Sequence, residues 1–137
     1  MARKSKHVRL FLTAAEARLD ESRHLSKYGY TMGAVYLAGY VVECVLKALV
    51  VGCHPEHEQQ GVITGFRGAL AHDYDWLLRR YRTAGGATLP REVAEAFGLL
   101  EPWGTDLRYN PRTQFAGDED EFFAAVTVVY EWARRRL

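Results

Sequence analysis

A long run of mostly apolar residues over 31–51 constrains the fold of this chain most strongly. Thr31 is a good N-cap residue, so the run predicts a helix about 30 Å long. A helix of this length and character could cross a membrane. Glu43 and Lys47 argue against that, because a charge costs about 2.5–3.5 kcal/mol at the centre of a membrane helix. We therefore expect a central helix packed by other helices, and no membrane association.

Other segments carry apolar residues at three- and four-residue steps, the period of a helix with one buried face. They cover residues 8–27, from 70 or 72 to 82, from 90 through 100, and 118–136. We expect a polar loop over 53–66, and irregular structure over 102–111 because Pro111 biases the preceding residue away from helix. The sequence thus predicts an all-α fold, an antiparallel up-and-down helical bundle of four to five helices.

Composition fits one soluble domain over residues 1–137. The chain is 48% hydrophobic and 26% charged, which is ordinary for a globular protein. The formal net charge of +1 gives no overall attraction to nucleic acid or to an anionic membrane. Two cysteines are too few for a disulfide framework, and the basic N-terminus lacks the apolar core of a secretory signal. We therefore expect a cytoplasmic protein.

One stripe of the predicted central helix carries Tyr36, Tyr40, Glu43 and Lys47, at steps of four, three and four residues. Glu43 and Lys47 have the favourable orientation for an ion pair, worth about 0.2–0.5 kcal/mol on an exposed helix. A buried pair would not be kept for stability alone. The stripe is therefore either a solvated surface or a polar seam that lines a cleft or a dimer interface.

A second group of candidate residues lies in the irregular segment before the last helix. It contains Arg108, Tyr109, Asn110 and Arg112. Two arginines, an aromatic ring and an amide could hold a phosphate and stack a base, because the planar guanidinium suits phosphate. The alternative is structural: Arg108 would pair with Glu43 or another carboxylate, and Tyr109 would pack in the core.

Three segments resemble bacterial HEPN domains. Residues 33–49 resemble the second HEPN helix, which is apolar with small residues and then carries a Glu, here Glu43, and a Leu-Lys pair. Residues 72–78 resemble the next helix, which often opens with His and contains a Leu pair. Residues 107–109 lie where the family carries an Arg-Tyr before its final helix. The match follows the family in order and spacing over essentially the whole chain.

The resemblance implies a helical bundle, usually a homodimer, that handles nucleotides or RNA. Some members are metal-independent ribonucleases in which a His follows an Arg by four to six residues. Others lack that motif and accompany a small nucleotidyltransferase, often as toxin–antitoxin pairs. No His follows Arg108, so that segment lacks a general acid or base for neutral pH. We therefore expect a non-catalytic module without a cofactor, whose partners are a second copy, a separately encoded nucleotidyltransferase, and RNA or a nucleotide.

For this reading, the sequence predicts a cleft with Arg108, Tyr109 and Asn110 on one side. Glu43, Lys47 and Tyr40 would face them. Arg108 would anchor a phosphate or a partner carboxylate, Tyr109 would stack, and Glu43 would orient the arginine.

The alternative is a ribonuclease toxin that uses Arg67 or Arg108 with His72. Arg67 and His72 have the family's spacing, and His72 also fits the start of the family's next helix. Chance alone predicts about as many such Arg–His pairs as this sequence contains, so the spacing itself carries little weight.

Two further clusters have bland interpretations. Cys53, His54, His57 and Glu58 follow no standard zinc spacing, so no metal site is expected. Basic residues gather within 3–9 and again at 134–136. They are either solvated ends or, if the termini lie close together, one patch that could hold RNA phosphates.

Overall fold

The computed structural model describes residues 3–109 and 118–137, and these are helical with no β-strand, which confirms the all-α prediction. The α-helices are α1 (Lys6–Lys27), α2 (Thr31–Gly52), α3 (Glu56–Thr64), α4 (Tyr74–Thr83), α5 (Arg91–Leu100) and α6 (Glu119–Arg136). Two short 3₁₀ helices are η1 (Ala69–His72) and η2 (Thr105–Tyr109).

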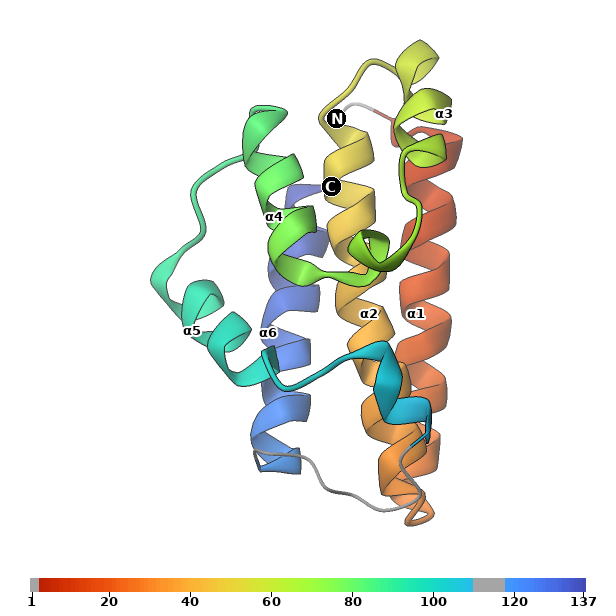
Figure 1. Ribbon diagram of the computed structural model, residues 1–137, viewed down its shortest axis with the longest axis vertical. Helices are drawn as coiled ribbons and strands as arrows, with labels where there is room; N and C mark the ends of the chain where they lie inside the picture. Colours follow the sequence, from red (N-terminus) through yellow and green to blue (C-terminus); the bar gives the residue numbers. More distant parts are fainter. Residues whose placement is uncertain (1–2, 110–117) are drawn as a thin grey trace.

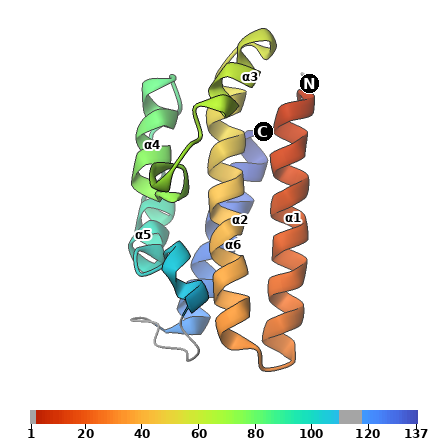
Figure 2. The same ribbon diagram turned by 45° about the vertical axis from the view of Figure 1, so that its right-hand side comes forward.

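The long helices α1, α2 and α6 form the body of a helical bundle. Helices α1 and α2 are antiparallel neighbours, and α6 packs against α2 and runs in the same direction as α2 (Figures 1 and 2). Helix α4 packs against α2, and α5 packs against α6. In chain order, η2 lies between α5 and α6, and it packs against α2. This contact places the residues of η2 beside those of α2 in the candidate site.

Helix α3 corrects the prediction of a polar loop over 53–66, and it raises the number of α-helices above the four to five expected. Its first turn carries Glu56 and Glu58, which favour a helix N-terminus, and Pro55 stands at the N-cap. Gln59 and Val62 are the residues it buries. Two buried residues are too few to give a periodic apolar pattern in the sequence.

Most helix ends follow the sequence signals. Gly29 has φ +83°, the left-handed conformation expected of a residue that ends a helix. Asp118 caps α6, because its side chain accepts hydrogen bonds from the backbone N–H groups of Asp120 and Glu121, at 2.8 and 3.1 Å. Thr31 is an exception: it is the first residue of α2, and Tyr30 occupies the N-cap without a side-chain hydrogen bond.

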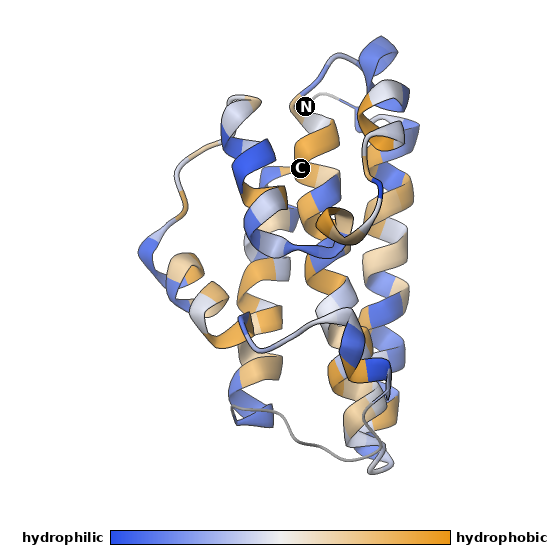
Figure 3. Ribbon diagram, viewed as in Figure 1, coloured by the Kyte–Doolittle hydropathy of each residue, from blue (hydrophilic) through white to orange (hydrophobic). Residues whose placement is uncertain are grey.

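Helix α2 is the centre of the core. Among the described residues it is the one helix long and apolar enough to cross a membrane, yet 72% of its apolar window is buried inside the protein. Figure 3 shows this apolar helix between the other long helices. Such burial is expected of a helix in the core of a protein. Because α2 is covered by other elements, its few polar side chains contact those elements as well.

Candidate functional site

A buried ionic cluster lies at the middle of α2. The Glu43 residue is only 4% exposed, and its Oε2 accepts a hydrogen bond from Lys47 Nζ at 2.9 Å. Its other oxygen, Oε1, lies 2.8 Å from His72 Nδ1. Phe66 covers Lys47, with 5.5 Å between Nζ and the ring centre. Glu43 and Lys47 are therefore buried, which is incompatible with a solvated stripe at these two positions.

His72 connects the buried Glu43 carboxylate with the protein surface. It is the last residue of η1, and its side chain is 42% exposed. Because a carboxylate can only accept, Nδ1 must donate to Glu43, and this leaves Nε2 of the neutral ring as a proton acceptor. Tyr40 lies edge-on to the imidazole, with ring centres 6.3 Å apart. A carboxylate–imidazole pair of this kind can exchange a proton with a ligand.

The tyrosine end of the stripe meets Arg108. The hydroxyls of Tyr36 and Tyr40 lie 3.1 Å apart, and burial, followed by this hydrogen bond, raises the pKa of Tyr40. Side-chain hydrogen bonds, first to Tyr109 and then to Tyr36, raise the pKa of Arg108 above its ordinary value. The Arg108 guanidinium also lies 4.7 Å from the centre of the Tyr109 ring. The result is an exposed cation set among three phenol rings.

The structure corrects two expectations about these residues. Glu43 does not orient or pair with Arg108, because His72 and Lys47 hold its two oxygens. Tyr109 is not a core residue, since it is 76% exposed. Asn110 and Arg112 lie outside the described residues.

Arg67 and His72, the alternative catalytic pair, are not brought together. Arg67 is exposed and donates from Nε to the Thr64 carbonyl at 2.8 Å. His72 contacts Glu43 and Tyr40 instead. Arg108 and His72 both neighbour Tyr40: His72 contacts its ring, and Arg108 is close enough to lower its pKa.

Gly39 and Trp103 fix the geometry of the site, and sequence reasoning missed both roles. The Trp103 indole packs so closely on Gly39 that a Cβ there would overlap its ring. Its Nε1 donates to the Tyr36 carbonyl at 3.2 Å. Tyr74 stacks on Trp103, with ring centres 5.4 Å apart, and donates to the Gly39 carbonyl at 2.7 Å. This contact fixes the segment that leads into η2, and hence Arg108, against α2.

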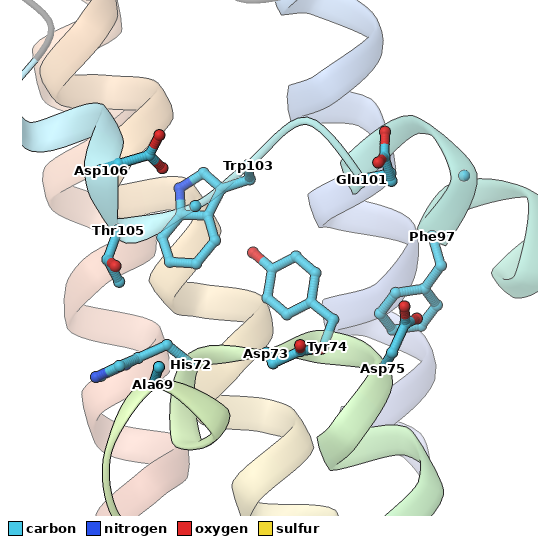
Figure 4. A pocket seen from close by; sticks show the side chains of 12 residues that line it. Ala69, His72, Asp73, Tyr74, Asp75, Phe97, Glu101, Trp103, Thr105 and Asp106 are labelled. Carbon is cyan, nitrogen blue, oxygen red and sulfur yellow. The ribbon is translucent and has the colours of Figure 1, made fainter.

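An acidic cleft of about 600 Å³ adjoins His72. Figure 4 shows its carboxylates on two sides of an aromatic floor of Tyr74, Trp103 and Phe97. The four carboxylates are Asp73, Asp75, Glu101 and Asp106. Within the described residues no three ligating side chains are placed to hold a metal ion. Because like charges repel, a phosphate is favoured beside Arg108 and disfavoured in this cleft.

Cys44 of α2 gives a first testable prediction. Burial raises the pKa of the Cys44 thiol to about 11, and burial also raises the pKa of the Cys53 thiol, but by a smaller shift. At pH 8 about one Cys44 thiol in a thousand is then ionised. We expect iodoacetamide to alkylate Cys53 first, and the rate at Cys44 to rise about tenfold per pH unit up to about pH 11. Peptide mass spectrometry measures both rates; equal rates at pH 8 would contradict the described burial.

No protein-family model matches this chain, and no curated protein and no solved structure matches it either. The structure defines an all-helical bundle in which His72 of η1 and Arg108 of η2 lie near the tyrosines of the central helix α2. The assignment of function therefore depends on the residues of that face.

Proposed function

We propose that this chain is a HEPN-like, non-catalytic helical module that binds RNA or a nucleotide through the face formed by Tyr36, Tyr40, His72, Arg108 and Tyr109. We call this the Arg108 face. The module acts as a homodimer and as the toxin–antitoxin-type partner of a separately encoded nucleotidyltransferase. The HEPN resemblance supports the class of function, and the contacts of Arg108 support the ligand.

The observation that carries the proposal is an exposed guanidinium with aromatic partners and no described carboxylate partner. The Arg108 guanidinium lies over the Tyr109 ring and forms no ion pair with a described carboxylate, so its charge is available to a ligand. Tyr109 is exposed, and a ring in that position can stack on a base. Phosphate and base are the two recognition elements that RNA and nucleotides share.

A ribonuclease is the second candidate, and His72 is the observation that favours it. Its Nδ1 is held by Glu43, and Tyr40 separates it from the Arg108 end of the stripe. An arginine for phosphate charge and an imidazole for proton transfer would then act from one face. In this candidate Arg108, and not Arg67, is the arginine.

Arg108→Gln is expected to weaken RNA binding at least about tenfold, because a hydrogen bond to a charged group is worth about 1.5–3 kcal/mol. The measurement is a gel shift of labelled single-stranded RNA in EDTA. Arg91→Gln is the matched control, since it removes the same charge from a side chain that is 93% exposed on α5. Equal affinity of the Arg108 and Arg91 variants would contradict the proposal.

The same gels separate the two candidates. A shift without cleavage is expected for the non-catalytic module. Cleavage that His72→Ala abolishes while binding remains would instead establish the ribonuclease. Growth arrest on expression that is lost in the same variant would agree with a toxin.

Tyr40→Asp tests the homodimer. Light scattering during size exclusion is expected to give the mass of two chains for the wild type. If the variant is a monomer that still binds RNA, assembly and binding are separate properties of the stripe.

A further inference from the structure

The start of α1 and the end of α6 lie close together at one end of the bundle. A Cβ added at Gly52, where α2 ends, would lie 3.4 Å from Leu137 Cδ2 and 3.7 Å from Val8 Cγ2. Leu137 is the last residue, and Val8 belongs to the start of α1. Both views of the ribbon place the start of α1 and the end of α6 at this end (Figures 1 and 2). Basic residues from the two ends of the sequence therefore share one region of the surface.

We call this region the basic end. Its exposed cations are Arg3, Lys4, Lys6, Arg9, Arg135 and Arg136. None of them forms an ion pair with a described carboxylate. The N-terminal four line a shallow hollow of about 360 Å³ in which Glu56 is the acidic residue. Arg134 does not belong to the basic end, because it lines a different groove together with three carboxylates of α1 and α6.

Hydrogen bonds of Ser5 hold the backbone at the start of α1 in place. Ser5 caps α1 by accepting from Val8 N at 3.2 Å, and its hydroxyl donates to Gln59 Oε1 at 2.6 Å. Gln59 is 4% exposed and donates in turn to the His54 carbonyl at 3.1 Å. Because this part of the chain is already ordered, its lysines and arginines lose less entropy when they bind an anion.

The charge at the start of α1 does not serve the stability of the helix. The first turn contains no acidic residue and begins with Lys6, followed by Arg9 in the next turn. Cations near a helix N-terminus oppose the helix dipole, and here they also repel one another. A bound anion would remove both unfavourable terms.

We propose that the basic end binds the phosphate backbone of RNA, as a second contact region away from the Arg108 face; this inference rests on the proposed RNA association. Four of its six cations are arginines, whose planar fork can bind a phosphate through two hydrogen bonds. An anionic membrane fits less well. The apolar face of α1, with Val8, Ala15 and Leu19, is buried in the bundle and is not free to enter a bilayer.

The test is the salt dependence of affinity for an unstructured single-stranded RNA in EDTA. Each phosphate contact contributes about 0.7 to the slope of log affinity against log salt concentration. Lys4→Gln/Lys6→Gln and Arg135→Gln/Arg136→Gln are each expected to lower that slope by about 1.4. The control Arg79→Gln/Arg91→Gln removes the same charge from exposed positions on α4 and α5 and is expected to keep the wild-type slope. Circular dichroism melting confirms that all variants are folded.

Each outcome separates the two proposals. A wild-type slope in either basic-end variant overturns the inference, because the two chain ends then do not form one site. If Arg108→Gln still weakens binding in that case, the proposed function survives. If the wild type binds no RNA, the inference fails, and a nucleotide is left as the proposed ligand of the Arg108 face. Binding to vesicles of anionic phospholipid without binding to RNA would assign the basic end to a membrane and overturn the inference as well.

Discussion

Glu43→Leu is expected to lower the free energy of unfolding by about 3–5 kcal/mol, the usual cost of breaking a buried ion pair. The Lys47 side chain is 11% exposed, and Glu43 is the carboxylate that neutralises it. Without Glu43 the ammonium remains beside Phe66 with no compensating charge. Urea unfolding of wild type and variant, followed by circular dichroism, measures the difference. A loss below about 1 kcal/mol, the range of surface pairs, would contradict the described burial.

The double variant Glu43→Leu/Lys47→Met is the matched control. It removes both charges and replaces them with apolar side chains of similar volume, a change that is often neutral or stabilising. We expect it to recover most of the stability lost in Glu43→Leu. His72→Ala keeps the buried pair and gives up a partly exposed hydrogen bond to a charged group, so we expect a smaller loss, about 1.5–3 kcal/mol at most.

Gly39→Ala is the second change with a large expected effect. A Cβ at this position would overlap the ring of Trp103, and the ring cannot simply rotate away while it stacks on Tyr74. Overpacking costs about 1–3 kcal/mol, and loss of the aromatic pair about 0.5–1.5 kcal/mol more. We therefore expect a loss of about 1.5–4.5 kcal/mol together with weaker RNA binding, because Trp103 positions the segment that carries Arg108.

Gly98→Ala provides the control for this substitution. Gly98 lies in α5, is exposed, and a Cβ there would have no neighbour within 4 Å. Alanine is a better helix former than glycine, so this variant is expected to gain about 0.5–1 kcal/mol. Opposite signs for the two glycines in the same urea experiment support the close contact with Trp103. Equal signs would mean that the indole does not pack on Gly39.

The parts of the fold that local patterns determine were predictable. Helices α1, α2 and α6 bury residues at helical spacing, and their ends carry recognisable signals such as Gly29 and Asp118. Helix α3 was missed because only Gln59 and Val62 are buried, too few to give a periodic pattern. Helices are predicted from a periodic stripe of apolar residues, so a helix with few buried residues is not recognised in the sequence.

The candidate site was predictable only where its residues lie on one helix. The steps between Tyr36, Tyr40, Glu43 and Lys47 place them on one stripe whatever surrounds α2. The partner of Glu43 was not predictable, since His72 is 29 residues away and arrives through tertiary packing. The sequence suggested Arg108 for that role on charge alone. A buried carboxylate needs a donor for each oxygen, and that rule would have widened the search to histidines.

The Arg108 face is tested most directly by an NMR titration of the wild-type protein with single-stranded RNA in EDTA. Chemical-shift changes are expected at Arg108, Tyr109, Tyr36, Tyr40 and His72, and not along the acidic cleft at Asp75 and Glu101. RNA binding that leaves the residues of the Arg108 face unchanged would contradict the proposed site. No change anywhere in the spectrum would contradict RNA as the ligand.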